Sequence, residues 1–308
     1  MASDSKVVIH AALVGNALIA VTKFIAAAIT GSSAMLAEGI HSVVDTGNQV
    51  LLLFGLRRAK RPPDARFPFG HGKEIYFWSF VVAILIFAVG AGISLYEGIH
   101  AVLDPHPVTN PAINYVVLGL AIVFEGAAWW FAWRGFRAAK GSLGYVEAVV
   151  RSKDPTLFVV LFEDSAALLG LVVALAGIAT AQATGAWWLD GAASMVIGCI
   201  LAATAVWLAV ETKGLLIGEA ASPAVIRDLR ERIAAHDCVR AVNEVLTLHM
   251  GPEYILVNAS VTFDPGARAE RVAAAVAAID HDLRTSWPEV RRVFIEGEGR
   301  QGSEQPVG

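Results

Sequence analysis

The sequence has little charge. Only 17% of its 308 residues are Asp, Glu, Lys or Arg, whereas a soluble domain carries about 25%. Hydrophobic residues make up 56% of the chain, and its mean hydropathy is +0.57. These two deviations exclude an ordinary soluble globular protein. They indicate an α-helical polytopic membrane protein that lies in a lipid bilayer.

Several other features are scarce or missing. The two cysteines, Cys199 and Cys238, are too few for a disulfide framework or a thiolate metal site. The formal net charge of −4 is too small to indicate a nucleic-acid partner. The chain has no His-Glu-x-x-His helix and no Gly-x-Ser-x-Gly turn, which argues against the enzymes built on those motifs. Its first residues lack a basic segment and a cleavage signal, so we expect the first apolar run to be retained.

Apolar runs dominate the first two thirds of the chain. Each is long enough to cross about 30 Å of hydrocarbon at about 1.5 Å per residue. They lie near residues 9–30, 34–56, 76–102, 112–134, 156–183 and 187–210. The second and fourth connectors are rich in Lys and Arg, whereas the first, third and fifth have neither. This alternation predicts six transmembrane helices with both termini in the cytoplasm.

The composition changes near residue 213, where polar residues become frequent. Helix, strand, strand, helix and strand patterns follow at residues 222–237, 241–250, 254–263, 267–287 and 290–296. The order αββαβ is typical of a small ferredoxin-like α+β domain. We therefore expect an N-terminal segment (1–8), a six-helix domain (9–212), a cytoplasmic ferredoxin-like domain (213–298) and a disordered tail (299–308).

The second apolar run carries a stripe of polar residues. At 100° per residue, Glu38, His41, Asp45 and Asn48 lie on one side of a helix. An ionisable side chain in hydrocarbon costs at least about 2.5 kcal/mol, so it marks a candidate functional site. His41 and Asp45, four residues apart, can place an imidazole nitrogen and a carboxylate oxygen on one cation. Asn48 is more simply interpreted as a residue that hydrogen-bonds to another helix.

Four motifs resemble those of a known family. They are LAEGIHSVVD in the second run, FPFGHGKE before the third, SLYEGIH at the end of the third and VFIEGEG near the C-terminus. With these motifs the chain resembles the cation diffusion facilitator family of divalent-metal/proton antiporters, over about residues 8–298. The resemblance implies a homodimer whose protomers each have six spans and a cytoplasmic metal-responsive domain.

The resemblance also implies a transport site between the second and fifth spans. In the family, two residues four apart on each of these spans bind the metal. Here the first pair is His41 and Asp45, and Asp164 takes the second Asp position. Val160 stands where the family has a histidine, so we expect the neighbouring Glu163 to supply the fourth ligand, although it points about 100° away from Asp164. A water molecule is the alternative.

One imidazole with two or three carboxylates suits Zn²⁺ and also admits Mn²⁺, Fe²⁺ or Co²⁺. These ligands bind metal only when they are deprotonated, so metal and protons compete for them. A free histidine titrates near a pH of about 6.5, which makes His41 the natural proton carrier. We therefore expect a secondary transporter that exports a divalent metal in exchange for protons, with the metal as substrate and no organic cofactor.

Other residues are weaker candidates. Glu38 lies one turn from His41 and is a candidate for the path by which the ion enters. Asp64 and His71 form a candidate second metal site in the second connector, although Phe67 stands where some family members have a further histidine. The candidates for a regulatory metal site in the C-terminal domain are His236, His249, His281 and Glu296.

Two other functions are open at this point. A membrane metal sensor would bind the ion without transporting it, and the departure at Val160 favours that alternative. An intramembrane metallohydrolase using His41, Asp45 and Glu163 is less favoured, because the chain lacks a nucleophile motif. The short acidic-to-neutral C-terminal tail and the absence of a transit-like N-terminal segment favour a bacterial inner membrane.

Overall fold

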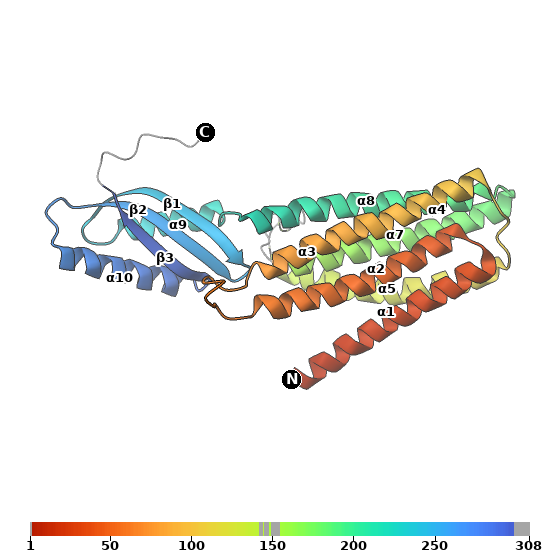
Figure 1. Cartoon of the computed structure of the whole chain (residues 1–308), viewed down its shortest axis with the longest axis horizontal. Helices are drawn as coiled ribbons and strands as arrows, with labels where there is room; N and C mark the ends of the chain where they lie inside the picture. Colours follow the sequence, from red (N-terminus) through yellow and green to blue (C-terminus); the bar gives the residue numbers. More distant parts are fainter. Residues whose placement is uncertain (1, 142–143, 145–147, 149–154, 299–308) are drawn as a thin grey trace. The chain divides into compact units, whose positions relative to one another are not determined.

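The computed structural model describes residues 2–141, 144, 148 and 155–298, with side chains from Asn16 onwards except those of residues 139, 156 and 157. Within these residues the chain forms two compact units (Figure 1). The first unit holds the chain up to Arg57 together with Glu74–Lys213. The second unit holds Arg58–Lys73 and the chain from Gly214 onwards. The expected disordered tail lies outside the described residues.

Long helices make up the first unit (Figure 1). They are α1 (Ala2–Thr30), α2 (Ser33–Ala59), α3 (Glu74–Leu85), α4 (Gly92–Leu103), α5 (Pro111–Lys140), α7 (Pro155–Thr184) and α8 (Trp188–Ile217). A π-helical turn, η1 (Ile86–Ala91), joins α3 to α4, so these two helices form one continuous stretch. Six helical stretches therefore occupy the positions of the six apolar runs in the part of the chain that the structure describes.

The first unit is a helical membrane domain. Four of its described stretches are long and apolar enough to cross a bilayer: Glu74–Leu103, Pro111–Ala138, Phe158–Thr184 and Trp188–Ile217. The described apolar part of α1 is shorter, and α2 carries the polar stripe. Large apolar side chains are exposed on these helices, which is typical of a surface that meets lipid. Examples are Ile25, Phe124, Phe131, Val172 and Val206.

Three helix connections and several close glycine contacts lie at one end of the first unit. The connections between α1 and α2, α4 and α5, and α7 and α8 all lie at one end, which we call the distal end (Figure 1). Near this end glycines bring α4 and α8 close together. A Cβ atom at Gly98 would lie 2.6 Å from the Met195 side chain, and one at Gly191 would lie 2.9 Å from the Ala101 side chain. Small residues of this kind let transmembrane helices pack backbone to backbone.

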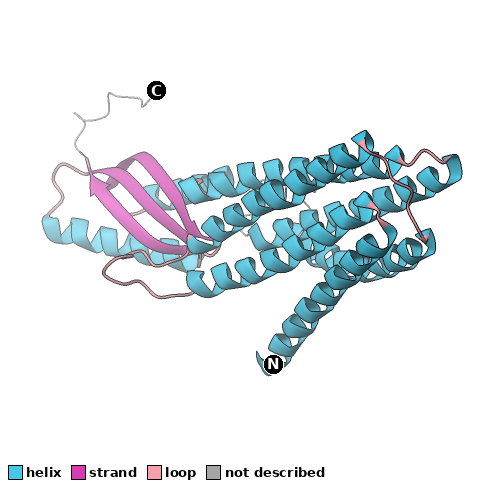
Figure 2. Cartoon of the chain, turned by 45° about the vertical axis from the view of Figure 1, so that its right-hand side comes forward, coloured by secondary structure: helices cyan, strands magenta, loops and turns pink. Residues whose placement is uncertain are grey.

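The second unit is a small α+β domain. It contains α9 (Pro223–Ala234), β1 (Val239–Gly251), β2 (Tyr254–Phe263), α10 (Ala269–Ser286) and β3 (Val290–Gly297). In the described residues the sheet has three strands, with β2 in the centre, antiparallel to β1 and parallel to β3 (Figure 2). Leu229 of α9 and Ile279 of α10 belong to one buried core with the strands, so both helices cover the same face. The element order matches the expected αββαβ.

The connector between α2 and α3 belongs to the second unit. Gly72 lies so close to the β1–β2 turn that a Cβ there would meet the Met250 carbonyl. The rings of Phe69 and Phe294 are 6.4 Å apart in an edge-to-face arrangement. The sequence analysis assigned this connector to the helical domain. Its contacts group it with the strands instead.

Candidate metal centre

His41 and Asp45 lie one turn apart on α2, as their spacing predicts. Both residues are buried, and the His41 Nδ1 is 3.1 Å from the Asp45 Oδ1. Neither ring nitrogen of His41 has a hydrogen-bond partner within the described residues. A buried imidazole nitrogen with no partner is available to a proton or to a metal ion.

Glu163 on α7 contacts the same stripe of α2. Its Oε1 accepts a hydrogen bond of 2.6 Å from the Asn48 side-chain amide, and its carboxyl group lies close to that of Asp45. Two buried carboxylates that lie close together repel each other unless a proton or a cation compensates their charge. Asp45 and Glu163 therefore form a pair in which a proton and a cation can replace each other. The interpretation of Asn48 as a residue that bonds to another helix is confirmed.

Two more carboxyl groups are buried nearby. Asp164 follows Glu163 on α7, and Glu125 lies on α5. Glu125 is close enough to interact electrostatically with both Asp45 and Asp164. From the sequence alone, Glu125 is interpreted as a residue that hydrogen-bonds to another helix and not as part of the site, although it is a lone carboxyl group inside an apolar run. Several buried carboxyl groups in apolar surroundings require protons or a cation to compensate them.

The expected ligands meet in pairs. Within the described part of the chain, no group of three or more His, Cys, Asp or Glu side chains is placed to hold a metal ion. The His41 imidazole lies beside the Asp45 carboxyl group, which in turn lies close to Glu163. Asp164 interacts electrostatically with Glu163. A cation bound here has to draw these side chains together by rotating them on their helices.

Glu38 forms an ion pair with Lys23 of α1. The Lys23 Nζ lies 3.1 Å from the Glu38 Oε2 and donates a hydrogen bond of 2.7 Å to the Ser42 hydroxyl. Both charged side chains are almost fully buried, at 1% and 0% exposure. On α7, a Cβ at Gly170 would meet the Glu38 Oε1, so the carboxylate packs directly against the Gly170 backbone. Glu38 therefore contacts both α1 and α7.

Asp190 at the start of α8 caps α2. Its Oδ2 accepts hydrogen bonds from the backbone N–H of Ser33 at 2.6 Å and from the Ser33 hydroxyl at 2.9 Å. Its Oδ1 accepts a hydrogen bond of 2.6 Å from the Ser32 hydroxyl. A carboxylate at a helix N-terminus satisfies free N–H groups and complements the helix dipole. Asp190 thus fixes the distal end of α2 to α8.

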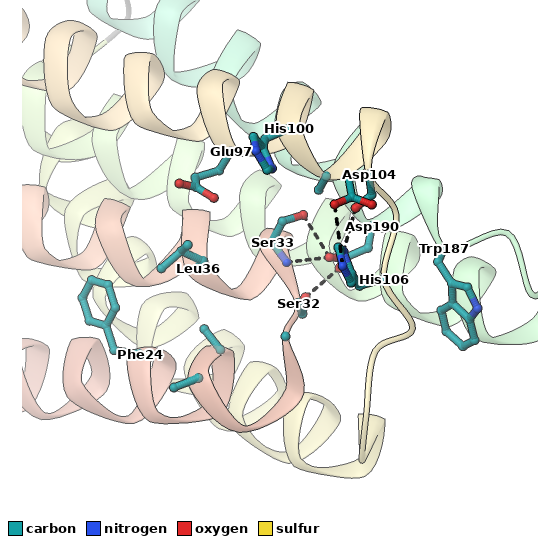
Figure 3. A pocket seen from close by; sticks show the side chains of 14 residues that line it. Phe24, Ser32, Ser33, Leu36, Glu97, His100, Asp104, His106, Trp187 and Asp190 are labelled. Carbon is teal, nitrogen blue, oxygen red and sulfur yellow. Dashed lines mark hydrogen bonds and ion pairs between the residues drawn. The ribbon is translucent and has the colours of Figure 1, made fainter.

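A cavity of about 480 Å³ opens at the distal end beside this cap (Figure 3). Residues of α1, α2, α4 and α8 line it, together with the connectors after α4 and before α8. Its polar lining consists of serine hydroxyls, imidazoles and carboxylates. The imidazoles and carboxylates belong to Glu97, His100, Asp104, His106 and Asp190.

Asp64 and His71 meet in the second unit. The His71 Nε2 is 3.0 Å from the Asp64 Oδ2. The Asp64 pKa is lowered, first by the hydrogen bond from the Phe67 backbone N–H and then by the one from His71. The Phe67 ring lies 4.6 Å from the His71 ring. The two residues form a pair, and the described residues add no third side chain that would make a metal site.

The candidate regulatory ligands are spread over the second unit. The His236 Nε2 lies 3.5 Å from the Asp282 Oδ2, between the end of α9 and α10. His249 is buried on β1, and His281 is exposed on α10. Glu296 on β3 accepts a hydrogen bond of 3.0 Å from Asn258. Among the described residues they form no cluster that could hold a metal.

Comparison with known proteins decides the family. The family model of the cation efflux transmembrane domain matches residues 9–217. The chain belongs to the cation diffusion facilitator family. Proteins of this family are transporters of metal cations, so the metallohydrolase alternative is excluded.

Relatives of this cation diffusion facilitator occur in animals, plants and bacteria. The chain is 36% identical over 267 residues to "Proton-coupled zinc antiporter SLC30A9, mitochondrial" of Xenopus laevis. The aligned region covers 86% of this chain and 47% of that protein. It is 34% identical over 193 residues to "Metal tolerance protein C4" of Arabidopsis thaliana, covering 62% and 42%. It is 29% identical over 191 residues to "Cation-efflux pump FieF" of Shewanella oneidensis, covering 62% and 60%.

The chain spans about half the length of the first two of these relatives. The name of the Xenopus protein includes the word mitochondrial. The expectation of a bacterial inner membrane therefore finds no support in that relative. The apolar helices and the family model show a membrane protein and do not identify the membrane.

Proposed function

We propose that this protein exports a divalent transition metal, Zn²⁺ in the first place, in exchange for protons through a site between α2 and α7. The contacts of Glu163 with Asn48 and Asp45 support this most strongly, because they bring the α7 carboxylate to the His41–Asp45 pair. The Xenopus relative, named a proton-coupled zinc antiporter, supports the ion and the exchange.

His41, Asp45 and Glu163 are the proposed ligands, with Asp164 or a water molecule as the fourth. Zn²⁺ accepts four ligands of mixed nitrogen and oxygen type. One imidazole among carboxylates is a harder donor set than two imidazoles, so we expect Mn²⁺, Fe²⁺ and Co²⁺ to compete. Glu163 thereby replaces the fifth-span histidine that is absent at Val160.

Proton exchange follows from the same ligands. A metal ion binds only after His41 and the carboxyl groups have lost their protons, and protonation expels it. Any proton held by Asp45 or Glu163 has to leave before an ion can bind between them. If the site faces the two sides of the membrane in turn, a proton gradient drives the metal out.

The remaining assignments complete the proposal. We infer six transmembrane spans, with both termini in the cytoplasm because the Arg- and Lys-rich connectors lie on that side. The second unit is proposed to be a ferredoxin-like domain of a homodimer. Asp64 with His71, and the histidines of the second unit with Glu296, remain proposed sites for further metal ions.

Flux measurements in proteoliposomes test the function. Acid-loaded vesicles are offered Zn²⁺, Mn²⁺, Fe²⁺ or Co²⁺ outside, and internal pH and metal uptake are recorded together. We expect wild type to take up metal and dissipate the gradient. Asp45→Ala should abolish both signals, whereas Glu211→Gln on α8 removes a charge from another helix and is the matched control.

The outcomes distinguish a metal/proton antiporter from a metal sensor that binds the ion without transporting it. Uptake that requires both the gradient and Asp45 supports the antiporter, and the ion series identifies the substrate. Metal binding in detergent with no flux of any ion in vesicles contradicts the transporter and favours the metal sensor.

A further inference from the structure

The Lys23–Glu38 ion pair lies between the candidate metal centre and the distal cavity. On α2, Glu38 is one turn, about 4.5 Å, from His41, and Leu36 and Ser33 beyond it line the cavity. On α1, the residue after Lys23 is Phe24, which also lines the cavity. Figure 3 shows Phe24 and Leu36 on the side of the cavity away from Trp187 and His106. Along the helix axes the pair therefore lies between the centre and the cavity, and neither of its residues lines the cavity.

The surroundings of Glu38 are those of an exchangeable ligand. Its Oε2 is held by Lys23, but its Oε1 is buried with no hydrogen-bond partner in the described residues. The Oε1 is directed at α7, where Gly170 leaves room for it. A buried ion pair kept only for stability is often replaced by apolar residues at no cost. A carboxylate with one oxygen still open is able to take a second cation.

We propose that Lys23 is a tethered cation that occupies Glu38 in this state and has to release it when the transported ion leaves. Glu38 is then a transient ligand between the metal centre and the distal cavity. This inference rests on the proposed transport function. The Lys23 ammonium and a divalent metal cannot both hold the Glu38 carboxylate at close range, because two cations repel each other strongly in a buried site.

The distal cavity suits an ion that has passed the pair. Its lining includes Glu97 and His100 of α4 and Asp104 and His106 of the connector after it. The last two are solvent-exposed, and the His106 Nε2 is 3.8 Å from the Asp104 Oδ2. Dispersed, exposed ligands of this kind bind a cation weakly and allow it to leave. Lys23 therefore lies between the buried candidate metal centre and the solvent-exposed ligands of the distal cavity.

The number of Zn²⁺ ions bound by the full-length protein in detergent tests the proposal. Equilibrium dialysis with Zn²⁺ alone is compared for wild type, Lys23→Met, Lys23→Arg and the double variant Lys23→Met/Glu38→Gln. Lys23→Met frees Glu38, so we expect one additional Zn²⁺ per protomer. The double variant and Lys23→Arg should return to the wild-type number. A pair that only joins α1 to α2 would not change this count.

Equal Zn²⁺ numbers in wild type and in folded Lys23→Met overturn the proposal, as does an additional ion that persists in the double variant. If Lys23→Met does not fold, Glu38→Gln is the second test. It should keep the wild-type Zn²⁺ affinity and slow Zn²⁺ flux at least about tenfold, and unchanged flux contradicts the proposal. Failure of the transport function shows separately, as an absence of flux in wild type.

Discussion

The side-chain amide of Asn48 on α2 donates a hydrogen bond of 2.6 Å to the Glu163 carboxylate on α7. This contact orients Glu163 toward Asp45 and leaves its second oxygen for a proton or a cation. Groups that orient a metal ligand typically change metal affinity about 10–100-fold when they are removed. The α2–α7 contact is therefore expected to control metal affinity.

Asn48→Leu should weaken Zn²⁺ binding about 10–100-fold while the protein stays folded, because Glu163 loses the donor that orients it. Equilibrium dialysis in detergent measures the affinity. Gln49→Leu is the matched control, since it removes a similar interhelical bond, from Asn16 of α1, away from the centre. Equal loss of affinity in both variants would mean that general helix packing, not ligand orientation, sets the affinity.

His41→Asp should shift ion preference from Zn²⁺ toward Mn²⁺ and Fe²⁺, because carboxylate oxygens are harder donors than imidazole. It should also flatten the pH dependence of flux near neutrality, where an imidazole titrates. Flux of each ion in acid-loaded vesicles, measured at several external pH values, checks both effects. An unchanged ion order and pH profile would remove His41 from the centre.

Asp190→Ala should lower stability by about 1–2 kcal/mol or more, because the N-terminal N–H of α2 and two serine hydroxyls lose their buried acceptor. Thermal unfolding in detergent measures the change. Asp104→Ala, an exposed carboxylate in the neighbouring connector, is the control and should have little effect. A Tm for Asp190→Ala equal to wild type would contradict the capping role.

Asp228 on α9 should make the second unit sensitive to acid. Its pKa is lowered, first by the hydrogen bond from the Trp287 indole N–H and then by the one from Arg232. A lowered pKa stabilises the fold above the unfolded value of about 3.9, and this stabilisation is lost as the pH falls through the folded pKa. Asp228→Asn should therefore lower the Tm of the full-length protein near neutral pH and converge with wild type in acid.

The control for Asp228 is Asp280→Asn, which breaks an exposed pair with Arg284 on α10. Exposed pairs contribute little, so this variant should leave the Tm nearly unchanged. A constant difference in Tm between wild type and Asp228→Asn from neutral to acidic pH would contradict the assignment.

The sequence predicted the elements that depend on local pattern. Apolar runs of span length became helices, and the 100° periodicity put His41, Asp45 and Asn48 on one stripe. The αββαβ order of the second unit followed from capping, turn and alternation signals. These features depend on residues within one or two turns of each other, which a linear sequence displays directly.

Contacts between helices could not be predicted from local sequence patterns, because their residues lie far apart in the sequence. Asp190 caps a helix that begins 157 residues earlier, and Lys23 has its partner on the next helix. The resemblance favoured Asp164 as the α7 ligand and Glu163 as its supplement, whereas Glu163 accepts the hydrogen bond from Asn48 of α2. The rotation of α7 about its axis decides between adjacent residues, and it is set mainly by packing against α5. The position of Glu125 beside the site depends on the same packing.

The most direct test of the central claim is Zn²⁺ uptake by Glu163→Gln in acid-loaded proteoliposomes, with internal pH recorded in the same vesicles. Glutamine keeps the size of the side chain and its contact with Asn48 but removes the charge that would bind the ion. The account predicts that Zn²⁺ uptake and proton release fall together by at least about 100-fold. Uptake and proton release near the wild-type rates would show that the metal does not bind between Asp45 and Glu163.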